Sequence, residues 1–294
     1  MQAPDHVYQA RRVRELSRRC EVSVIGKSLC GREIFAVNIG DSPAPALIAA
    51  GFHGMEYMTV SAALHFASEC AENPPCRGVT IVPCVNPDGV EIALHGEGAA
   101  CRYRRFVRQT GSACRWQANA RGVDINHNFN ADWQNVKRRE RTAGIIKPAP
   151  TRFGGFFPES EPETRALTRL CRRQAFSRVL ALHSQGREIY WDFGGCTPPG
   201  CLPLAEKMAA AGGYRVASPE PMATGGGFKD WFIKEFRRCG FTVEMGLGKN
   251  PLPLSDSGTG VFVGVGTGVG LGVGVGVGFS PERICTSGAT FPST

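Results

Sequence analysis

Apolar and polar positions alternate near the start of the chain and then give way to longer apolar runs. Residues 20–26 and 32–40 each alternate with the period of a β-strand and flank a short polar turn, which predicts a hairpin. Two apolar runs, ALIAAGFHG at 46–54 and GVTIVPCVNPDG at 78–89, follow on either side of a helical stretch at 59–71. This alternation predicts an α/β sheet with helices on its faces.

The same order of elements returns in the second half of the chain. The pattern predicts a helix at 159–173, a strand at 177–184, a helix at 227–236 and a strand at 240–245. In open α/β sheets, functional groups gather in the crevice where strands end. His53, His183 and Glu244 all occupy such ends, so we expect their side chains to converge.

The sequence changes character after Ser257, where glycine and valine alternate almost without interruption from 261 to 279. The even spacing of these glycines excludes a G-x-G-x-x-G phosphate loop. Alternate glycines also remove the helix propensity and hydrophobicity of a membrane span. We expect one folded domain at 1–256 and a low-complexity tail at 257–294 that is floppy or prone to β-aggregation.

Composition narrows the class of partner and the compartment. The net charge is +8, but the arginines are scattered and no recognition motif accompanies them, so we expect no nucleic-acid partner. The N-terminal residues lack the apolar core of a secretory signal, which favours the cytoplasm. The twelve cysteines are irregularly spaced without a C-x-x-C pair, so we expect mostly reduced thiols and no structural zinc on cysteine.

His53 and Glu56 form an H-x-x-E pattern at the end of an apolar strand, where imidazole and carboxylate can turn onto one ion. The pattern alone is weak, since a histidine beside a strand is often a hydrogen-bonded structural residue. His183 supplies a second imidazole at a strand end, and two histidines with one glutamate are a catalytic zinc set that leaves a position open. The alternative for His183 is a buried core histidine.

Glu244 is a carboxylate on an otherwise apolar strand, where burial is costly unless the group faces a cleft or a partner. Water on a zinc ion needs a proton acceptor, and Glu244 is the candidate. An ion pair with one of the many arginines is the alternative.

Asp124, Asn126 and His127 lie together in a dense polar segment that suggests the wall of a site. Asp124 has the chemistry to orient a ligand histidine, and Asn126 to hold a substrate carboxylate or amide. A simple turn rich in Asn and Asp explains the same residues without any ligand.

Five motifs in order, HGME, NPDGVE, GVDINHNF, LHSQG and FTVEMGLGKNP, resemble the zinc carboxypeptidase family typified by carboxypeptidase A. The resemblance spans about residues 20 to 256 and implies a single-domain α/β/α sandwich with a mixed central sheet. The segments RWQANARGVDINHNF and HSQGREIYW are most similar to the bacterial branch that cleaves γ-D-glutamyl bonds to diaminopimelate or lysine in peptidoglycan stem peptides.

The resemblance implies roles for individual residues. It implies one zinc ion on His53, Glu56 and His183, with Glu244 as general base and later proton donor to the leaving amine. It also implies that Asp124 braces His53 and that Asn126 contacts a substrate carboxylate. An arginine is expected to polarise the scissile carbonyl, and the candidates are Arg115 first, then Arg102, Arg104, Arg105 and Arg108.

Three departures from the family pattern bear on specificity and stability. His127 stands where carboxypeptidases have an arginine that clamps the terminal carboxylate, and Met222 falls near the family's mobile tyrosine. The Gly/Val run replaces the usual closing helix, so we expect reduced stability. We therefore expect a peptide or muropeptide substrate in the cell wall, with His127 beside Asn126 at the substrate. An ordinary metallocarboxypeptidase and an inactive zinc-binding module are the alternatives.

Overall fold

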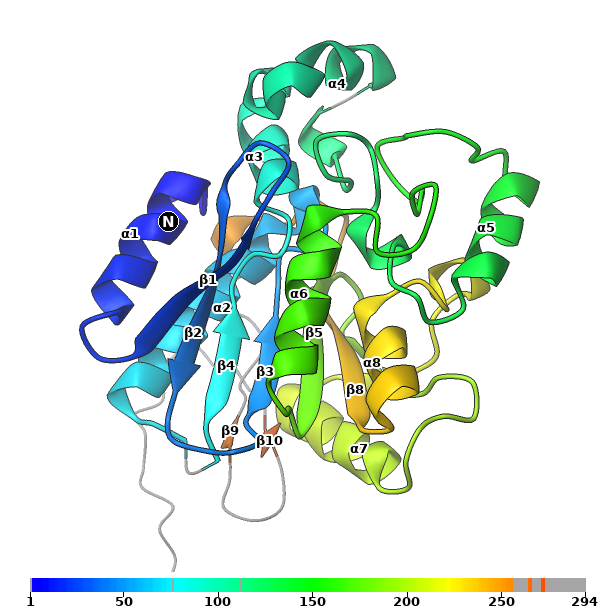
Figure 1. Cartoon of the computed structure of the whole chain (residues 1–294). Coiled ribbons are helices and arrows are strands. Elements are labelled where there is room, and N and C mark those ends of the chain that lie inside the picture. Colours follow the sequence, from blue (N-terminus) through cyan, green and yellow to red (C-terminus); the bar gives the residue numbers. More distant parts are fainter. Residues whose placement is uncertain (1, 76, 112, 256–263, 266–270, 273–294) are drawn as a thin grey trace, which may run out of the picture.

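The computed structural model describes residues 2–75, 77–111, 113–255, 264–265 and 271–272. Its centre is an eight-stranded sheet in the order β1-β2-β4-β3-β5-β8-β6-β7 (Figure 1). The strands are β1 (Glu21–Lys27), β2 (Glu33–Ile39), β3 (Ala46–Ala49), β4 (Val79–Val82), β5 (Arg178–Ser184), β6 (Glu188–Tyr190), β7 (Arg215–Ala217) and β8 (Cys239–Met245).

The four central strands of the sheet are parallel. β3 pairs in parallel with β4 and β5, and β5 pairs in parallel with β8. The hairpin β1–β2 joins this core antiparallel to β4, and β6 joins the other side antiparallel to β8. The sheet is therefore mixed, as the resemblance implied, and the carboxyl ends of its central strands meet at one edge.

Helices cover both faces of the sheet (Figure 1). One core contains residues of α1 (His6–Leu16), α2 (Tyr57–Glu72) and α7 (Cys201–Gly212), and the other contains residues of α6 (Pro162–Arg173) and α8 (Phe228–Phe236). The remaining helices are α3 (Pro87–His95), α4 (Arg104–Thr110), α5 (Trp133–Thr142) and the short η1 (Gly54–Glu56), η2 (Glu97–Tyr103), η3 (Ala113–Arg115), η4 (Ile125–His127) and η5 (Pro221–Ala223).

The central strands are mostly apolar because both of their faces are buried. In β3, Ala46 and Ile48 belong to the core under α1 and α2, whereas Leu47 and Ala49 belong to the core under α6 and α8. Successive side chains of a strand point to opposite faces, so a strand between two helical layers needs apolar residues at every position. The predicted α/β/α sandwich is confirmed.

Most of the predicted tail at 257–294 lies outside the described residues. Within it, β9 (Gly264–Val265) pairs antiparallel with β10 (Leu271–Gly272). The expectations of a low-complexity tail and of reduced stability stay predictions. Among the described residues, no helix has both the length and the apolar character needed to cross a membrane.

A disulfide joins Cys201 on α7 to Cys239 at the start of β8, with Cα atoms 5.5 Å apart. It is an exception to the expectation of mostly reduced thiols. Because the bond closes a loop between residues 38 apart in sequence, chain entropy predicts that it stabilises the fold by about 4 kcal/mol.

Cys239→Ser, which removes this disulfide, should lower the midpoint of urea unfolding. A reductant should lower the midpoint of the wild type by a similar amount. Cys196→Ser is the control, and equal midpoints for Cys239→Ser and oxidised wild type would contradict the prediction.

Glu163, at the start of α6, is a fully buried carboxyl group. Burial raises its pKa to about 8, and the negative charges of Asp88 and Glu161 act in the same direction. Because the folded-state pKa exceeds the unfolded one, folding is favoured at low pH and loses stability as the pH rises towards 8. Since each pKa unit corresponds to about 1.4 kcal/mol, the loss should reach several kcal/mol.

Glu163→Gln should therefore flatten the dependence of the unfolding free energy on pH between 5 and 8. Urea unfolding at several pH values measures it, with Glu72→Gln, an exposed carboxylate on α2, as the control. Slopes for Glu163→Gln that match those of the wild type would show that Glu163 is not the titrating group.

Candidate metal centre

The loop after β3 carries His53 and Glu56 and is held by backbone contacts on two sides. The amide of Gly54 donates to the carbonyl of Gln117, and the amide of Met55 donates to that of Trp116. Gly54 packs so tightly on α3 that an added Cβ would lie 2.1 Å from the carbonyl oxygen of Gly89. The glycine of the HGME motif is thus required for this close approach.

Asn86, from the NPDGVE motif, holds the same loop in place through hydrogen bonds of its side chain. Its side-chain amide donates to the carbonyl oxygens of Phe52, Gln117 and Ala118, at 3.0 to 3.2 Å. Its carbonyl oxygen accepts from the amide of Gly89 and caps α3. One buried side chain therefore joins the strand end, the 117–118 segment and the start of α3.

His183 and Glu244 lie side by side at the ends of neighbouring parallel strands. They are direct partners in the register of β5 and β8. The ring of His183 is buried and stacks on Phe52, with ring centroids 5.0 Å apart. The sheet therefore places both residues at its carboxyl edge, as the strand ends predicted.

The structure brings His53, Glu56 and His183 together around one point. Nδ1 of His53 lies 2.8 Å from Oε1 of Glu56, and Nδ1 of His183 lies 3.0 Å from Oε2. One ligand atom from each of the three residues lies within 4.8 Å of the others. Donors bound at about 2.1 Å to a tetrahedral zinc ion lie about 3.4 Å from one another, so two imidazoles and a carboxylate gathered this closely form a donor set that suits zinc.

Asp124 holds His53 from the side opposite Glu56. Its Oδ1 lies 3.1 Å from Nε2 of His53 and also accepts from the amide of Asn126, while Oδ2 accepts from the amide of Arg152. The contact with His53 is one that a bracing role requires, and the contact with the Asn126 amide is a turn; the bracing role of Asp124 stays a prediction. Because a carboxylate on Nε2 favours the tautomer with a proton there, Nδ1 is left with a lone pair for a metal.

The charges at the centre are strongly coupled. Burial acts to raise the pKa of Glu56, but His53 and His183 outweigh it and lower the pKa to about 2. Burial acts to lower the pKa of His53, but the charges of Glu56 and Asp124 raise it well above its usual value. The carboxylates therefore stay ionised, in the form that binds a cation, whereas His53 holds a second proton without a metal and must release it from Nδ1 when a metal binds.

Glu244 is in a different electrostatic position from Glu56. Burial raises the pKa of Glu244 well above its usual value, and the negative charge of Glu56 raises it further. No ion pair within the described parts of the chain includes Glu244. The alternative of an arginine partner is therefore not supported, and a carboxyl group with a raised pKa beside a metal site is suited to accept a proton.

Asn126 and Glu244 line a common pocket, together with residues of α8 and of the loop before it. Oδ1 of Asn126 accepts from the amide of Phe228 at the start of α8, 3.1 Å away. Because its carbonyl oxygen is engaged there, the amide nitrogen is the group that Asn126 offers to a ligand.

A family model described as zinc carboxypeptidase matches residues 7–261, most of the chain. The chain belongs to the zinc carboxypeptidase family. This confirms the resemblance carried by the five motifs, and it makes zinc the metal that family membership implies for the His-Glu-His cluster.

Two curated relatives of this zinc carboxypeptidase family member are named for the peptides on which they act, γ-D-glutamyl-L-diamino acid peptides and murein peptides. Gamma-D-glutamyl-L-diamino acid endopeptidase 1 of Lysinibacillus sphaericus is 33% identical over 248 residues, which cover 78% of this chain and 61% of that protein. Murein peptide amidase A of Escherichia coli K12 is 32% identical over 171 residues, which cover 52% of this chain and 57% of that protein. The chain thus spans about three fifths of these relatives.

Solved structures of zinc carboxypeptidases share the fold. Bovine thrombin-activatable fibrinolysis inhibitor matches with a TM-score of 0.69 at 20% identity, over 87% of this chain and 91% of that one. The murein-tripeptide amidase of Escherichia coli O157 matches with a TM-score of 0.52 at 24% identity, over 80% of this chain and 86% of that one. These likenesses support the α/β/α sandwich.

His127, which replaces the clamping arginine of zinc carboxypeptidases, is buried and faces α5. Its Nδ1 lies 3.4 Å from Oε1 of Glu140, whose other oxygen pairs with Lys137. Among the described residues, the pocket lined by Asn126 and Glu244 does not include His127. The structure therefore shows a packing role for His127, and contact with substrate stays a prediction.

Arg115 is exposed in η3, which lies against η1, the short helix that ends at Glu56. The competing arginines occupy η2 and α4, where Arg108 pairs with Glu97 and Arg102 lies over Tyr103. The position of η3 favours Arg115 as the arginine at the carbonyl, but this role also stays a prediction.

The predicted tyrosine position falls on Met222 in η5, next to Ala223, which lines the pocket. The sequence did not single out three other pocket residues: Tyr190 on β6, and Lys229 and Asp230 on α8. The adjacent charges within FKDWF are a signal that was present in the sequence, because charged residues between buried aromatics need a specific partner.

Proposed function

We propose that this protein is a zinc peptidase that hydrolyses the bond between γ-D-glutamate and a diamino acid in peptidoglycan stem peptides. The observation that carries the proposal is the convergence of donor atoms from His53, Glu56 and His183 directly beside Glu244. One ion held by these three side chains, with a coordination position left for water, is the arrangement of catalytic zinc sites.

Each residue has a part in the proposed reaction. A zinc ion at this site would polarise the scissile carbonyl and lower the pKa of bound water. Glu244 takes a proton from the attacking water and later gives it to the leaving amine. Arg115 stabilises negative charge that develops on the carbonyl oxygen, and Asn126 holds the main-chain carboxylate of the residue whose amine leaves.

The substrate class rests on the two relatives named for cell-wall peptides and on the environment of His127. A carboxypeptidase that clamps a terminal carboxylate needs a charged, bidentate group, and an imidazole paired with Glu140 is not one. This observation favours the stem peptide over an ordinary carboxypeptidase substrate. The basic chain also suits an acidic peptide.

One assay tests the proposal directly. Purified protein is incubated, with and without a chelator, with L-Ala-γ-D-Glu-meso-diaminopimelate and with a model peptide of ordinary amino acids that has a free C-terminus. We expect cleavage of the first peptide alone, loss of activity with chelator, and recovery when zinc is added. Cleavage of only the second peptide would identify a carboxypeptidase, and cleavage of neither by a zinc-loaded sample would refute the enzymatic proposal.

A further inference from the structure

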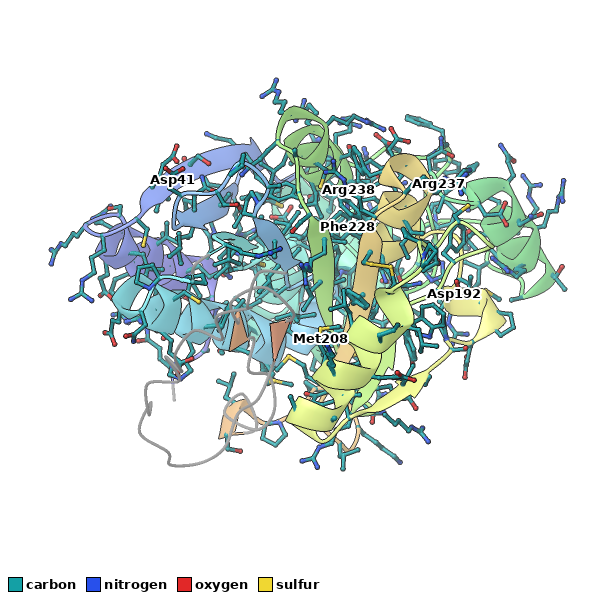
Figure 2. All side chains as sticks on the ribbon, turned by 90° about the horizontal axis from the view of Figure 1, so that it is seen from below. Asp41, Asp192, Met208, Phe228, Arg237 and Arg238 are labelled. Carbon is teal, nitrogen blue, oxygen red and sulfur yellow. A yellow bond between two sulfur atoms is a disulfide. The ribbon has the colours of Figure 1, made fainter. Side chains whose placement is uncertain are left out.

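Two cysteines outside the disulfide are brought together by the fold although they lie far apart in sequence. Sulfur atoms are spread through the molecule (Figure 2), so a pair in contact is a specific feature. Cys30 lies in the turn between β1 and β2, and Cys101 lies in η2. The thiol of Cys30 is in hydrogen-bond contact with the thiol of Cys101. Neither residue has a part in the proposed reaction.

Polar contacts hold the β1–β2 turn against η2 on both sides of the two thiols. Nη2 of Arg32 donates to the carbonyl of Ala99 in η2 at 3.0 Å, and Nη1 pairs with the buried carboxylate of Asp88 at 2.6 Å. The amide of Cys30 donates to the other oxygen of Asp88 at 2.9 Å. The thiol of Cys101 contacts the carbonyl of Ala99 at 3.9 Å. The positions of both cysteines are therefore set by their neighbours.

Apolar packing joins the same two segments. Cys30 from the turn and Ala99 from η2 both pack against a buried cluster that includes Ala100 and Trp116. Two groups that the fold already holds in contact react as if each were at a very high concentration for the other. A bond between the two thiols therefore needs little further ordering of the chain.

The backbone at Cys101 is kinked. Its φ of 52° and ψ of −127° interrupt η2. A positive φ is unfavourable for a residue with a Cβ atom and persists where surrounding contacts impose it. The conformation of Cys101 is therefore imposed by tertiary contacts, among which the contact with Cys30 is one.

The two thiols differ in their surroundings. Cys101 is exposed, so a reagent in solution can reach it, whereas Cys30 is half-buried. Burial raises the pKa of Cys30 above its usual range, and the hydrogen bond with Cys101 raises it further. Since a thiol with a high pKa is a slow leaving group, a disulfide that contains Cys30 should resist reduction.

We propose that Cys30 and Cys101 form a second disulfide by exchange with a small-molecule disulfide such as oxidised glutathione, and that this bond ties η2 to the β1–β2 turn. The thiolate of Cys101 attacks one sulfur of the reagent, forms a mixed disulfide and releases a first thiolate. The thiolate of Cys30 then attacks Sγ of Cys101 and releases a second thiolate. The protons lost by the two cysteines pass to the two released thiolates. Two cysteine thiols are thereby oxidised, and one small-molecule disulfide is reduced to two thiols.

Peptide mapping of the full-length chain tests this inference without any assay of activity. The folded protein is incubated with oxidised glutathione, its remaining thiols are blocked, and it is digested without reductant by trypsin and a glutamate-specific protease. These enzymes release Cys30 within residues 28–32 and Cys101 within residues 98–102, each without a second cysteine. We expect most of the two peptides to be recovered as one cross-linked species that a reductant separates.

A second measurement addresses the effect of the bond on η2. Amide hydrogen exchange in η2 should be slower in the cross-linked protein than in the reduced protein, because the bond prevents η2 from separating from the turn. Cys101→Ser, at an exposed position, should give neither the cross-link nor the slower exchange. Cys196→Ser, which removes a cysteine in the loop after β6, is the matched control and should behave as the wild type.

Each other outcome overturns the inference. Recovery of both peptides with blocked thiols, or of either one joined to a different cysteine, would show that the pair does not form a disulfide. A cross-link that appears only in urea would show that the fold does not favour it. Unchanged exchange in η2 of the cross-linked protein would overturn the proposed tie to the turn. If Cys101→Ser does not fold, the digest of the wild type decides.

Discussion

Glu244→Gln should lower kcat by at least about 10³-fold while zinc stays bound, because the amide keeps the shape of the side chain but cannot accept a proton. Glu244 is the register partner of His183 and not one of the three proposed ligands, so the metal affinity should change little. The measurement is kcat on the diaminopimelate tripeptide, together with zinc content by elemental analysis. Glu220→Gln, an exposed carboxylate in the loop before η5, is the matched control.

Two results would refute this assignment. If Glu244→Gln retained activity within about 10-fold of the wild type, another group would have to be the base. If the variant lost its zinc, Glu244 would belong to the metal set and the three-residue ligand set would be wrong. Unchanged zinc with lost turnover is the combination expected of a base that does not bind the metal.

His183→Ala should lose both zinc and activity. Two protein ligands cannot hold the ion as three do, and the substitution leaves Oε2 of Glu56 without its imidazole partner in a buried site. We expect zinc affinity to fall by more than about 100-fold, which is the upper end of what a change outside the ligand set costs. Competition with a chromophoric chelator measures the affinity.

His65→Ala provides the control for His183→Ala, because His65 is an exposed histidine on α2 that pairs with Glu69. Its zinc affinity should equal that of the wild type. If His183→Ala bound zinc as tightly as this control, the metal would have to lie elsewhere. A folded His183→Ala protein without zinc would confirm the ligand assignment independently of activity.

The sequence predicted the sheet and the centre of the site well because both follow from local patterns. Residues 46–52 and 179–182 are uninterrupted apolar runs, as expected for strands buried on both faces. His183 and Glu244 could be placed together because parallel strands end at one edge, so two strand-end residues meet whatever their separation in sequence.

The pocket wall could not be predicted in the same way. Tyr190 reaches the pocket because β6 pairs antiparallel with β8, and no pattern in its short strand specifies that partner. The Cys201–Cys239 bond likewise depends on α7 crossing to the start of β8. Both are consequences of tertiary connectivity between segments with little periodicity of their own.

His127 shows a different limit. The sequence placed it beside Asn126, but consecutive residues in the short helix η4 point in different directions, and Glu140 on α5 takes up the ring of His127. Which of two neighbours faces a cleft depends on the turn geometry and on distant partners. The types of residue in this segment indicate neither the turn geometry nor the distant partners.

The two oxygens of Asp124 connect the metal centre to residues 152–153, which include none of the proposed zinc ligands. One oxygen contacts His53, the other accepts from the amide of Arg152, and the amide of Asp124 donates to the carbonyl of Phe153. Binding equilibria linked through a shared group act in both directions. Zinc occupancy should therefore slow hydrogen exchange at the Arg152 amide, and a ligand that displaces this segment should weaken zinc by the same factor.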